Sequence, residues 1–304
     1  MDVRRLELLR ELADRGSVTA VAAATGRTAS AVSQQLKILE REAGVRLTEP
    51  AGRGIQLTDA GRTLARTAQD VAAAIARAEA VWEDFVERPS GVVTMTILPT
   101  AGEMLLPGVL HALADVPGLE LRCRDLDADV VDTEDLTPDF DIVLTDSSGV
   151  LPRWAERGLT VVPLLREALD VAMPEGHRLA AKTSLSAADL AGETWIGTLE
   201  GLPFDRVLSR IERVNGTPAI VTQRFTDNGV VEALVAAGHG IAILPRFTTR
   251  NHENGLVTRP LRGVRSSRLL SALMRPDRAE RPSVRRVVRA LQAEAESVES
   301  AHAG

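Results

Sequence analysis

The chain has a single cysteine, Cys123, among its 304 residues. One thiol cannot close a disulfide within the chain or build a cysteine-rich metal site, and such sparse cysteine suits a reducing compartment. Cys123 falls in an apolar stretch, so we expect a buried, inert thiol. A redox switch would need a second cysteine in the chain or an exposed thiolate.

Long apolar runs are missing as well. None reaches the roughly 20 residues that a membrane-spanning helix needs. The N-terminal stretch MDVRRLELLRELADR is charged throughout, unlike a signal peptide. We therefore expect a cytoplasmic protein with no membrane partner.

Recognisable enzyme motifs are absent too. The sequence contains no GxSxG, GxGxxG, P-loop lysine, CxxC or HExxH motif. Its five histidines are too scattered along the chain to suggest a metal site. These absences argue against an enzyme, and nothing in the sequence implies a cofactor or a metal.

The net charge of −6 at pH 7 does not suggest a nucleic acid partner until it is divided along the chain. Residues 1–58 carry nine basic and seven acidic side chains, whereas residues 59–304 carry 27 basic and 35 acidic ones. The small basic excess at the N-terminal end gives only a weak steering field, which two copies in a dimer would double.

Residues 17–47 predict two helices joined by a tight turn at Gly26, with Thr28 as the N-cap of the second helix. At helical spacing, one face of that helix is an apolar stripe of Val32, Leu36, Leu39 and Ala43. Another face carries Ser30, Gln34, Lys37 and Arg41, with Ser33 beside them. Hydroxyls, amides and cations read base edges and hold phosphates, although a solvated amphipathic helix has the same two faces.

A helix from about Val3 to Asp14, stopped by Gly16, is predicted before this pair. Gly44 ends the second helix of the pair, and the proline and glycines of Thr48–Leu57 predict a two-stranded wing. At its tip, a basic side chain either contacts a phosphate or the minor groove, or is a solvated loop residue. The predicted DNA-binding residues are Thr28, Ser30, Ser33, Gln34, Lys37, Arg41 and Arg53.

A long helix is predicted from Thr58 to about Glu87. Its apolar positions begin at Gly61 and repeat at alternating steps of three and four residues, which demands a partner helix. The predicted dimer seam is Leu64, Ala68, Val71, Ile75, Ala78, Trp82 and Phe85. Packing against its own chain is the alternative, because alanines on the seam also allow close intrachain contact. Pro89-Ser90-Gly91 then predicts a hinge.

From Val92 the pattern changes to alternating strands and helices, which predicts an α/β fold with a mainly parallel sheet. The predicted strands are Val92–Leu98, Leu119–Cys123, Phe140–Thr145, Leu159–Leu165, Leu169–Met173, Trp195–Gly197, Ile220–Thr222, Ile241–Leu244 and Leu269–Met274. The predicted helices lie near Leu105–Leu113, Ser186–Leu190, Phe204–Val214, Asp227–Ala237 and Pro282–Val298. The segment Asp125–Asp141 has eight acidic residues among seventeen and predicts a solvated acidic loop or short helix.

The stretch from Ser17 to Leu47 resembles the helix-turn-helix of the LysR-type transcriptional regulators. The matching residues are Ser17-Val18-Thr19, Ala22, Ala24, Ala31-Val32-Ser33, Gln35-Leu36, Leu39-Glu40, Gly44, Leu47 and Leu57-Thr58-Asp59-Ala60-Gly61. The run Val235–Pro245 is similar to the family's helix-Gly-x-Gly-strand-Pro pattern. Thr25, Arg27 and Thr48 depart from the family pattern, which weakens the core of the small domain slightly. The resemblance covers essentially the whole chain.

The resemblance implies a winged helix-turn-helix over residues 1–58, a dimerisation helix and hinge over 59–89, and an effector-binding domain over 90–304. That last domain has periplasmic-binding-protein-like architecture, with one subdomain of about 90–163 and 266–304 and a second of about 164–265. The implied partners are double-stranded DNA with a partly palindromic operator, a small-molecule effector, and further copies of the chain, as dimers that pair into tetramers.

The same resemblance points to effector contacts. Ligands of open α/β sheets bind at the carboxyl ends of strands, where helix N-termini offer unpaired N–H groups. The positions that match the family's effector contacts are Thr100 with the adjacent Ala101, Thr145, Thr198 and Asn228. Helix N-capping needs the same residue types and is the alternative for each. Asp146 inside the cleft would repel a carboxylate, which leaves the charge of the effector open.

We therefore interpret the chain as a sequence-specific DNA-binding transcriptional regulator whose C-terminal domain senses a small molecule. The alternative is a solute-binding protein, or a transferase-type enzyme, that uses the two-lobed cleft. The missing signal peptide argues against a solute-binding protein, and the missing motifs argue against an enzyme.

Overall fold

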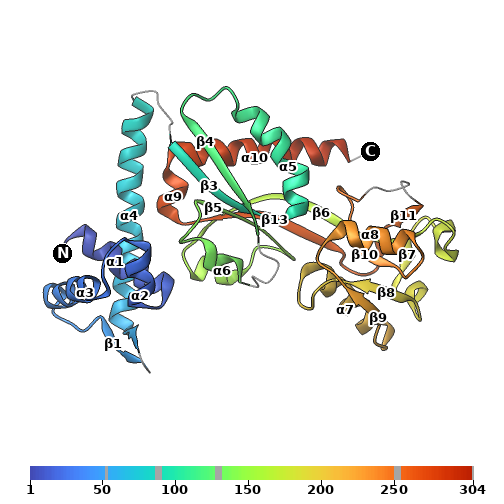
Figure 1. Cartoon of the computed structure of the whole chain (residues 1–304), viewed down its shortest axis with the longest axis horizontal. Helices are drawn as coiled ribbons and strands as arrows, with labels where there is room; N and C mark the ends of the chain where they lie inside the picture. Colours follow the sequence, from blue (N-terminus) through green and yellow to red (C-terminus); the bar gives the residue numbers. More distant parts are fainter. Residues whose placement is uncertain (52–53, 86–90, 127–131, 250–254, 303–304) are drawn as a thin grey trace.

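The computed structural model describes residues 1–51, 54–85, 91–126, 132–249 and 255–302. The molecule is elongated, and three parts follow one another along its long axis (Figure 1). We call them the head (residues 1–57), the inner lobe (the part with α5, α9 and α10) and the outer lobe (the part with α7 and α8). Helix α4 stands between the head and the inner lobe.

The head consists of α1 (Val3–Arg15), α2 (Val18–Ala24), α3 (Ala29–Ala43) and a hairpin of β1 (Thr48–Ala51) and β2 (Gly54–Leu57). The predicted caps are present, because Thr28 Oγ1 accepts a hydrogen bond from the Ala31 N–H, and Gly16 and Gly44 end α1 and α3 in the left-handed conformation. The three helices close on one core around Leu9, Val21, Val32 and Leu39. The predicted winged helix-turn-helix is confirmed.

Helix α4 (Asp59–Phe85) has two faces of different character. One face is made of small buried residues that pack on α1 of the head and on α9 (Pro276–Glu280) of the inner lobe: Gly61, Ala65, Ala68, Ala73, Ala76 and Ala80. A Cβ on Gly61 would lie 2.1 Å from the carbonyl oxygen of Leu47, so no larger residue fits there. The opposite face exposes Ile75, Val81 and Trp82.

The predicted seam residues therefore divide between these faces. Gly61 and Ala68 contact their own chain, as the intrachain alternative expected, whereas Leu64 and Val71 are half-buried. Ile75, Ala78 and Trp82 are exposed. The side chain of Phe85 and the predicted hinge residues Pro89 and Ser90 lie outside the described residues.

The central sheet has seven strands in the order β10-β6-β13-β5-β3-β4, with β11 also paired to β6. The strands are β3 (Gly91–Ile97), β4 (Leu119–Asp125), β5 (Ile142–Ser147), β6 (Thr160–Pro174), β10 (Ala242–Pro245), β11 (Leu256–Arg259) and β13 (Ser267–Met274). Within the described part of this sheet, only the β3–β4 and β3–β5 pairs are parallel, so the prediction of a mainly parallel sheet is wrong. The reason is that β6 and β13 run antiparallel to each other and to their other neighbours.

Strand β6 also corrects a second prediction. Two strands were expected at Leu159–Leu165 and Leu169–Met173, but β6 is one continuous strand of 15 residues. Its first half packs in the inner-lobe core through Leu165, and its second half packs in the outer-lobe core through Leu169 and Val171. Strands β6 and β13 therefore run from one lobe toward the other (Figure 1).

The inner-lobe sheet is covered on both sides. Helices α5 (Pro99–Leu113) and α10 (Pro282–Ala301) pack together on one face, around Met95, Leu105 and Leu291. On the other face, Trp154 of the short helix α6 (Pro152–Glu156) packs against Val143 and Leu273. Helices α6 and α9 were not predicted, because helices of five residues carry too little periodicity.

The outer lobe contains α7 (Pro203–Asn215), α8 (Asn228–Ala236) and the parallel pair β8 (Thr194–Gly197) and β9 (Ile220–Arg224). Smaller elements are β7 (Leu185–Ser186), β12 (Leu261–Arg262) and the 3-10 turns η2 (Arg178–Ala181) and η3 (Ala187–Leu190). The helix predicted near Ser186–Leu190 is this single turn η3. Gly240 has no room for a side chain, because its Cβ would lie 2.8 Å from the Thr194 carbonyl oxygen.

The acidic segment is less solvated than predicted. Residues 127–131 lie outside the described residues, and the 3-10 turn η1 (Thr133–Leu136) follows. Glu134 is buried between Arg153 and the Trp154 indole, and Asp141 is buried where it accepts hydrogen bonds from the Thr94 N–H and from Arg281. Two of its acidic residues thus serve the fold of the inner lobe.

Candidate DNA-reading face and effector cleft

One exposed face of α3 carries the polar residues that the sequence singled out. Ser30, Gln34, Lys37 and Arg41 are exposed and Ser33 is half-buried. Val32, Leu36 and Leu39, on the opposite side of the helix, are buried in the head core. The fold thus leaves two hydroxyls, an amide and two cations on one exposed helical surface, which suits the edges and phosphates of a duplex.

Glu40 fixes the wing relative to α3. Its Oε1 accepts hydrogen bonds from the N–H groups of Leu47 and Thr48 and from the Thr48 hydroxyl, each at 2.9 Å. Burial acts to raise the pKa of Glu40, but the bonds from Thr48 and Leu47 outweigh it and hold the pKa below its usual value. Glu40 is therefore an ionised clamp between the recognition helix and the wing. Arg53, at the predicted wing tip, lies outside the described residues.

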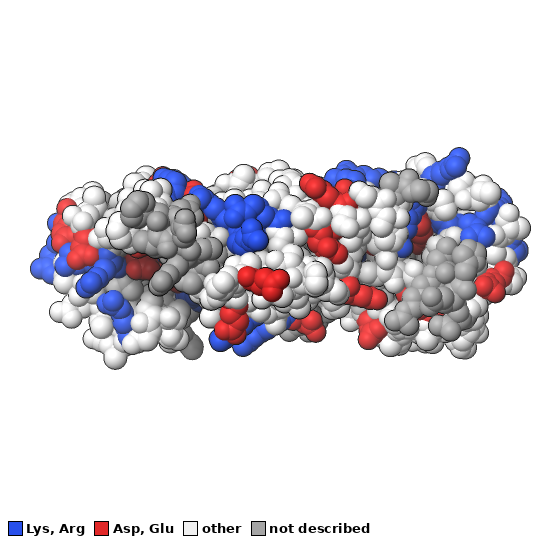
Figure 2. Space-filling model, turned by 90° about the horizontal axis from the view of Figure 1, so that it is seen from above, with Lys and Arg blue, Asp and Glu red and all other residues white. Residues whose placement is uncertain are grey.

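Positive and negative side chains are interspersed on one face of the molecule. Seen from above, the described part of that face shows both blue and red side chains, without one continuous basic surface (Figure 2).

A cavity of about 480 Å³ lies between the inner and outer lobes. Thr100 and Thr145 line it from the inner lobe, and Thr198 and Asn228 line it from the outer lobe. The structure thus brings together four of the five predicted effector residues, which are up to 128 positions apart in the sequence. Ala101 differs, because it is fully buried in the inner-lobe core and does not line the cavity.

N-capping does not explain the presence of Thr100 and Asn228 in the cavity. Helix α5 begins after Leu98 without a side-chain cap, and the Thr100 hydroxyl instead accepts a hydrogen bond from Arg268 Nη2 at 2.8 Å. Helix α8 is capped by Asp227, whose Oδ1 accepts from the Val230 N–H, so Asn228 is not its cap. Thr145 accepts a hydrogen bond from the Thr133 hydroxyl at 2.9 Å.

Arg268, which the sequence did not single out, is the central side chain of the cavity. It is only 2% exposed. Its Nε and Nη2 both donate to Glu167 Oε2, at 2.8 and 2.6 Å, and its Nη1 donates to Asp146 Oδ2 at 3.0 Å. Its guanidinium also lies over the Phe204 ring, 5.3 Å from the centroid. Burial opposes its charge, but the carboxylates of Glu167 and Asp146 outweigh that effect and raise its pKa.

At the floor of the cavity, two carboxylates share the one guanidinium of Arg268, and Arg153 on the wall is paired with the buried Glu134. The Thr100 hydroxyl accepts from Arg268 and keeps its own proton to donate. The floor suits an uncharged oxygen acceptor or a cationic group. On the wall, Arg206 donates to the Gly201 carbonyl oxygen and forms no ion pair with a described residue. Apolar walls come from Leu126, Leu151, Trp154, Leu202 and Phe204.

Two further observations bear on function. No helix within the described ranges is long and apolar enough to cross a membrane. In the same part of the chain, no group of three or more His, Cys, Asp or Glu side chains is arranged to hold a metal ion.

Comparison with known proteins gives matches over nearly the whole length. The family model described as "Bacterial regulatory helix-turn-helix protein, lysR family" matches residues 3–62, and the model "LysR substrate binding domain" matches residues 87–296. The DNA-binding transcriptional dual regulator OxyR of Escherichia coli is 26% identical over 296 residues, which is 96% of this chain and 95% of OxyR. The transcriptional dual regulator GltC of Bacillus subtilis is 26% identical over 82% of each chain.

Solved structures share the fold. A full-length OxyR variant from Pseudomonas aeruginosa aligns with a TM-score of 0.62 at 18% identity, over 96% of this chain and 98% of that one. Full-length CbnR in complex with its target DNA aligns with a TM-score of 0.54 at 19% identity, over 97% of this chain and all of CbnR.

Proposed function

Because the chain belongs to the LysR family of DNA-binding transcriptional regulators, we propose that its α3 face and wing read an operator. Ser30, Ser33 and Gln34 contact base edges, Lys37 and Arg41 hold phosphates, and Thr28 caps the recognition helix at the DNA surface. Arg53 contacts the backbone or minor groove from the wing. The observation that supports this proposal is the exposed polar face of α3, backed by a fully apolar one.

Salt-dependent binding tests the proposal. Fluorescence anisotropy with the DNA upstream of the gene should give saturable binding whose affinity falls steeply as salt rises, because phosphate contacts release counterions. A scrambled duplex of equal length is the control. Equal affinity for both duplexes would remove sequence-specific reading from the proposal.

We propose that the exposed face of α4 forms the dimer. Ile75, Ala78 and Trp82 are exposed and Val71 is half-buried, whereas the alanine face is occupied by the same chain. Leu64, at the start of the exposed face, is half-buried against the head core. Two antiparallel or crossed copies of α4 then present two heads to a partly palindromic operator, and pairs of dimers give tetramers. Ala68 packs within its own chain and is removed from the seam.

We further propose that the inter-lobe cavity binds a small effector, in the cytoplasm and without catalysis. Thr100 donates to an acceptor on the effector, Thr145 and Arg268 shape the floor, and Thr198 and Asn228 close from the outer lobe. The net anionic floor favours an uncharged or cationic polar group attached to an apolar body. We also propose that the chain divides into its domains and subdomains at about residues 58, 89, 163 and 265.

The rival interpretations lack support. Both LysR family models match, at the head and at the cleft, so a solute-binding protein or a transferase-type enzyme is not favoured. Several relatives are hydrogen peroxide-inducible activators by name. The one cysteine of this chain, Cys123, is half-buried and not fully buried as predicted. Desolvation still raises the pKa of its thiol, which disfavours the reactive thiolate, so we do not extend a peroxide response to it.

A further inference from the structure

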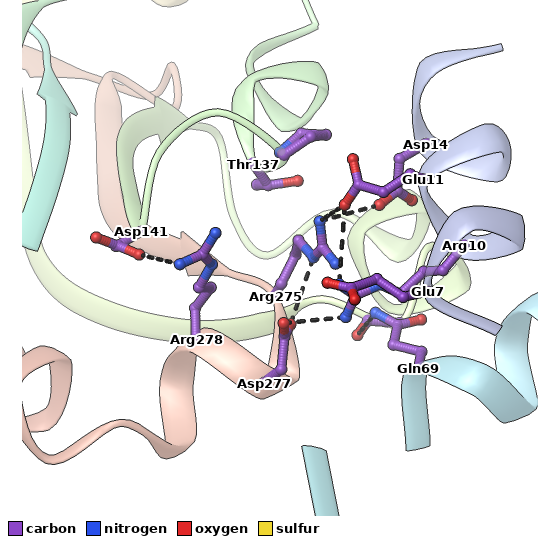
Figure 3. A network of polar contacts seen from close by, with 12 residues as sticks. Glu7, Arg10, Glu11, Asp14, Gln69, Thr137, Asp141, Arg275, Asp277 and Arg278 are labelled. Atoms are coloured by element: carbon purple, nitrogen blue, oxygen red, sulfur yellow. Dashed lines mark hydrogen bonds and ion pairs between the residues drawn. The ribbon is translucent and has the colours of Figure 1, made fainter. Parts of the chain in front are cut away.

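Charged side chains of the head are buried against the inner lobe. Arg10 and Glu11 of α1 are both under a tenth exposed, although they lie on a helix of the head (Figure 3). Across the contact, Arg275 Nη1 donates to Glu11 Oε1 at 2.8 Å, and Arg10 Nη1 donates to Asp277 Oδ2 at 2.9 Å. Arg275 also lies 3.4 Å from Asp14. We call the six residues Arg10, Glu11, Asp14, Arg15, Arg275 and Asp277 the latch.

Arg15 extends the latch to a second point of the inner lobe. Its Nε donates to Glu11 at 2.7 Å, and its Nη2 lies 2.9 Å from Asp139 Oδ1 and donates to the Pro138 carbonyl. The latch has three cations and three anions, and the carboxylates of Glu7 and Asp139 also pair with its arginines. Arg10, Glu11 and Arg275 are buried at its centre, whereas Asp14 is exposed at its edge. A buried ion cluster contributes little net stability compared with an apolar contact, but it fixes one relative orientation, because any other leaves a buried charge unpaired.

Some buried polar atoms of the latch have no hydrogen-bond partner in the described part of the chain. Arg10 Nε and Arg275 Nη2 are buried without a hydrogen-bond partner among the described residues. Arg275 Nε and Asp277 Oδ1 lie 3.3 Å apart, but they do not form a hydrogen bond either. Buried polar atoms without such partners are costly and regain hydration when the contact opens. This polar part of the contact between the head and the inner lobe is therefore easier to open than an apolar contact, and α4 also packs on both parts.

Strand β13 joins the latch to the cleft. Arg268, the central residue of the cavity, lies near the start of β13, and Arg275 follows its last residue. The seven steps between them span roughly 23 Å of extended chain. Midway, the register with β6 shifts between Leu270 and Ser271, and the fully buried Ser271 hydroxyl has no hydrogen-bond partner among the described residues. A bulge is where a strand can change its twist without losing its neighbours.

We propose that the latch holds the DNA-reading head against the inner lobe, and that β13 transmits the occupancy of the cleft to it. An effector that changes the bonds of Arg268 alters the position of β13, and so the fit of Arg275 between Glu11, Asp14 and Asp277. This proposal rests on the proposed function, since it names how the cleft regulates the head.

Calorimetry tests the latch without DNA or effector. The double variant Glu11→Gln/Arg275→Gln removes one cation and one anion and leaves the other latch charges balanced. Its matched control is Arg5→Gln/Glu42→Gln, which removes an ion pair between α1 and α3 inside the head. We expect one cooperative unfolding transition for the wild type and the control, and a separate, earlier transition of the head for the latch variant.

A milder second variant, Arg15→Gln/Asp139→Asn, keeps this test decisive if the first variant does not fold. It should also lower the melting temperature of the head. A single transition in every variant that folds would overturn the latch.

A thermodynamic cycle tests the transmission. Arg268→Lys keeps the charge but cannot donate to Glu167, Asp146 and Thr100 at once. In the wild-type background, we expect this change to shift the operator Kd by at least about fivefold, the lower end of allosteric coupling. In the latch-variant background, the shift should fall below about twofold, because the latch carries it.

Equal shifts in both backgrounds, or no shift in either, would overturn transmission through the latch. Failure of the wild type to bind upstream DNA in a salt-dependent way would instead reject the proposed function. The calorimetric result on the latch would stand in that case, so the two failures are distinguishable.

Discussion

Replacing Arg268 with methionine leaves a buried carboxylate without its partner. Glu167 is fully buried, and its Oε2 accepts both hydrogen bonds that Arg268 Nε and Nη2 donate. Removing one partner of a buried ion pair typically costs about 3–5 kcal/mol, because the other charge stays desolvated. For a chain of this size that corresponds to a fall in Tm of roughly 10 °C.

The double variant Arg268→Met/Glu167→Gln distinguishes a lost charge balance from lost packing. Glutamine keeps an oxygen for the Phe247 N–H, which Glu167 Oε1 accepts at 2.9 Å, and removes the unpaired charge. We expect it to recover more than half of the lost stability in thermal or denaturant unfolding. A double variant no more stable than Arg268→Met would show that packing on Phe204, and not charge, makes Arg268 important.

Five further changes test other parts of the molecule. Gln34→Ala should lose roughly 1–3 kcal/mol on the cognate operator and little on random DNA, whereas Lys37→Ala should weaken both and flatten the salt slope; equal losses for Gln34→Ala on all sequences would end its base-reading role. Ile75→Glu should fold, because Ile75 is 38% exposed in the single chain, but give monomers in light scattering; a tight dimer would place the interface elsewhere. Thr100→Val should keep operator binding and weaken the effector response about ten- to hundredfold in a reporter assay, and an unchanged dose response would move the site. The pKa of Glu40 is lowered in the folded state, so its carboxylate stabilises the fold above the unfolded pKa of about 4.3, and this stabilisation is lost as pH falls through the lower folded pKa. Glu40→Gln should therefore lower the free energy of unfolding at pH 7 and make that free energy fall less steeply with acid. Identical pH profiles for the variant and the wild type would contradict the clamp.

The head could be predicted because its structure is encoded locally. Thr28, Gly16 and Gly44 are caps that act within one turn of their own helix, and the apolar stripe of α3 fixes which side faces the core. Four cleft residues were also found in advance, because the family resemblance supplied positions that spacing alone does not give. Ala101 was included only as a neighbour of Thr100, and its side chain points into the core.

The centre of the cleft could not be predicted because its partners are far apart in the sequence. Arg166 and Glu167 lie between the two strands that were predicted here, but β6 continues through them. Glu167 is tolerated there only because Arg268, 101 positions later, neutralises it. The visible hint was one arginine inside the apolar run of β13, and its meaning depends on which strands are neighbours. The latch escaped prediction for the same reason, since Glu11 and Arg275 are 264 positions apart.

The latch has a consequence for the exchange of parts between related regulators. A chimera that joins this head to another protein's sensing domain brings Arg10 and Glu11 against a surface without Arg275 and Asp277, and leaves two buried charges unmatched. In chimeras that carry Arg10, Glu11, Arg275 and Asp277 together, the head should therefore dock on the inner lobe. In chimeras joined only at the end of α4, the two parts should fold, but effector binding should not change DNA binding. The part of this protein that has to be exchanged as one piece is therefore the head together with α9, although most of the chain lies between them in the sequence.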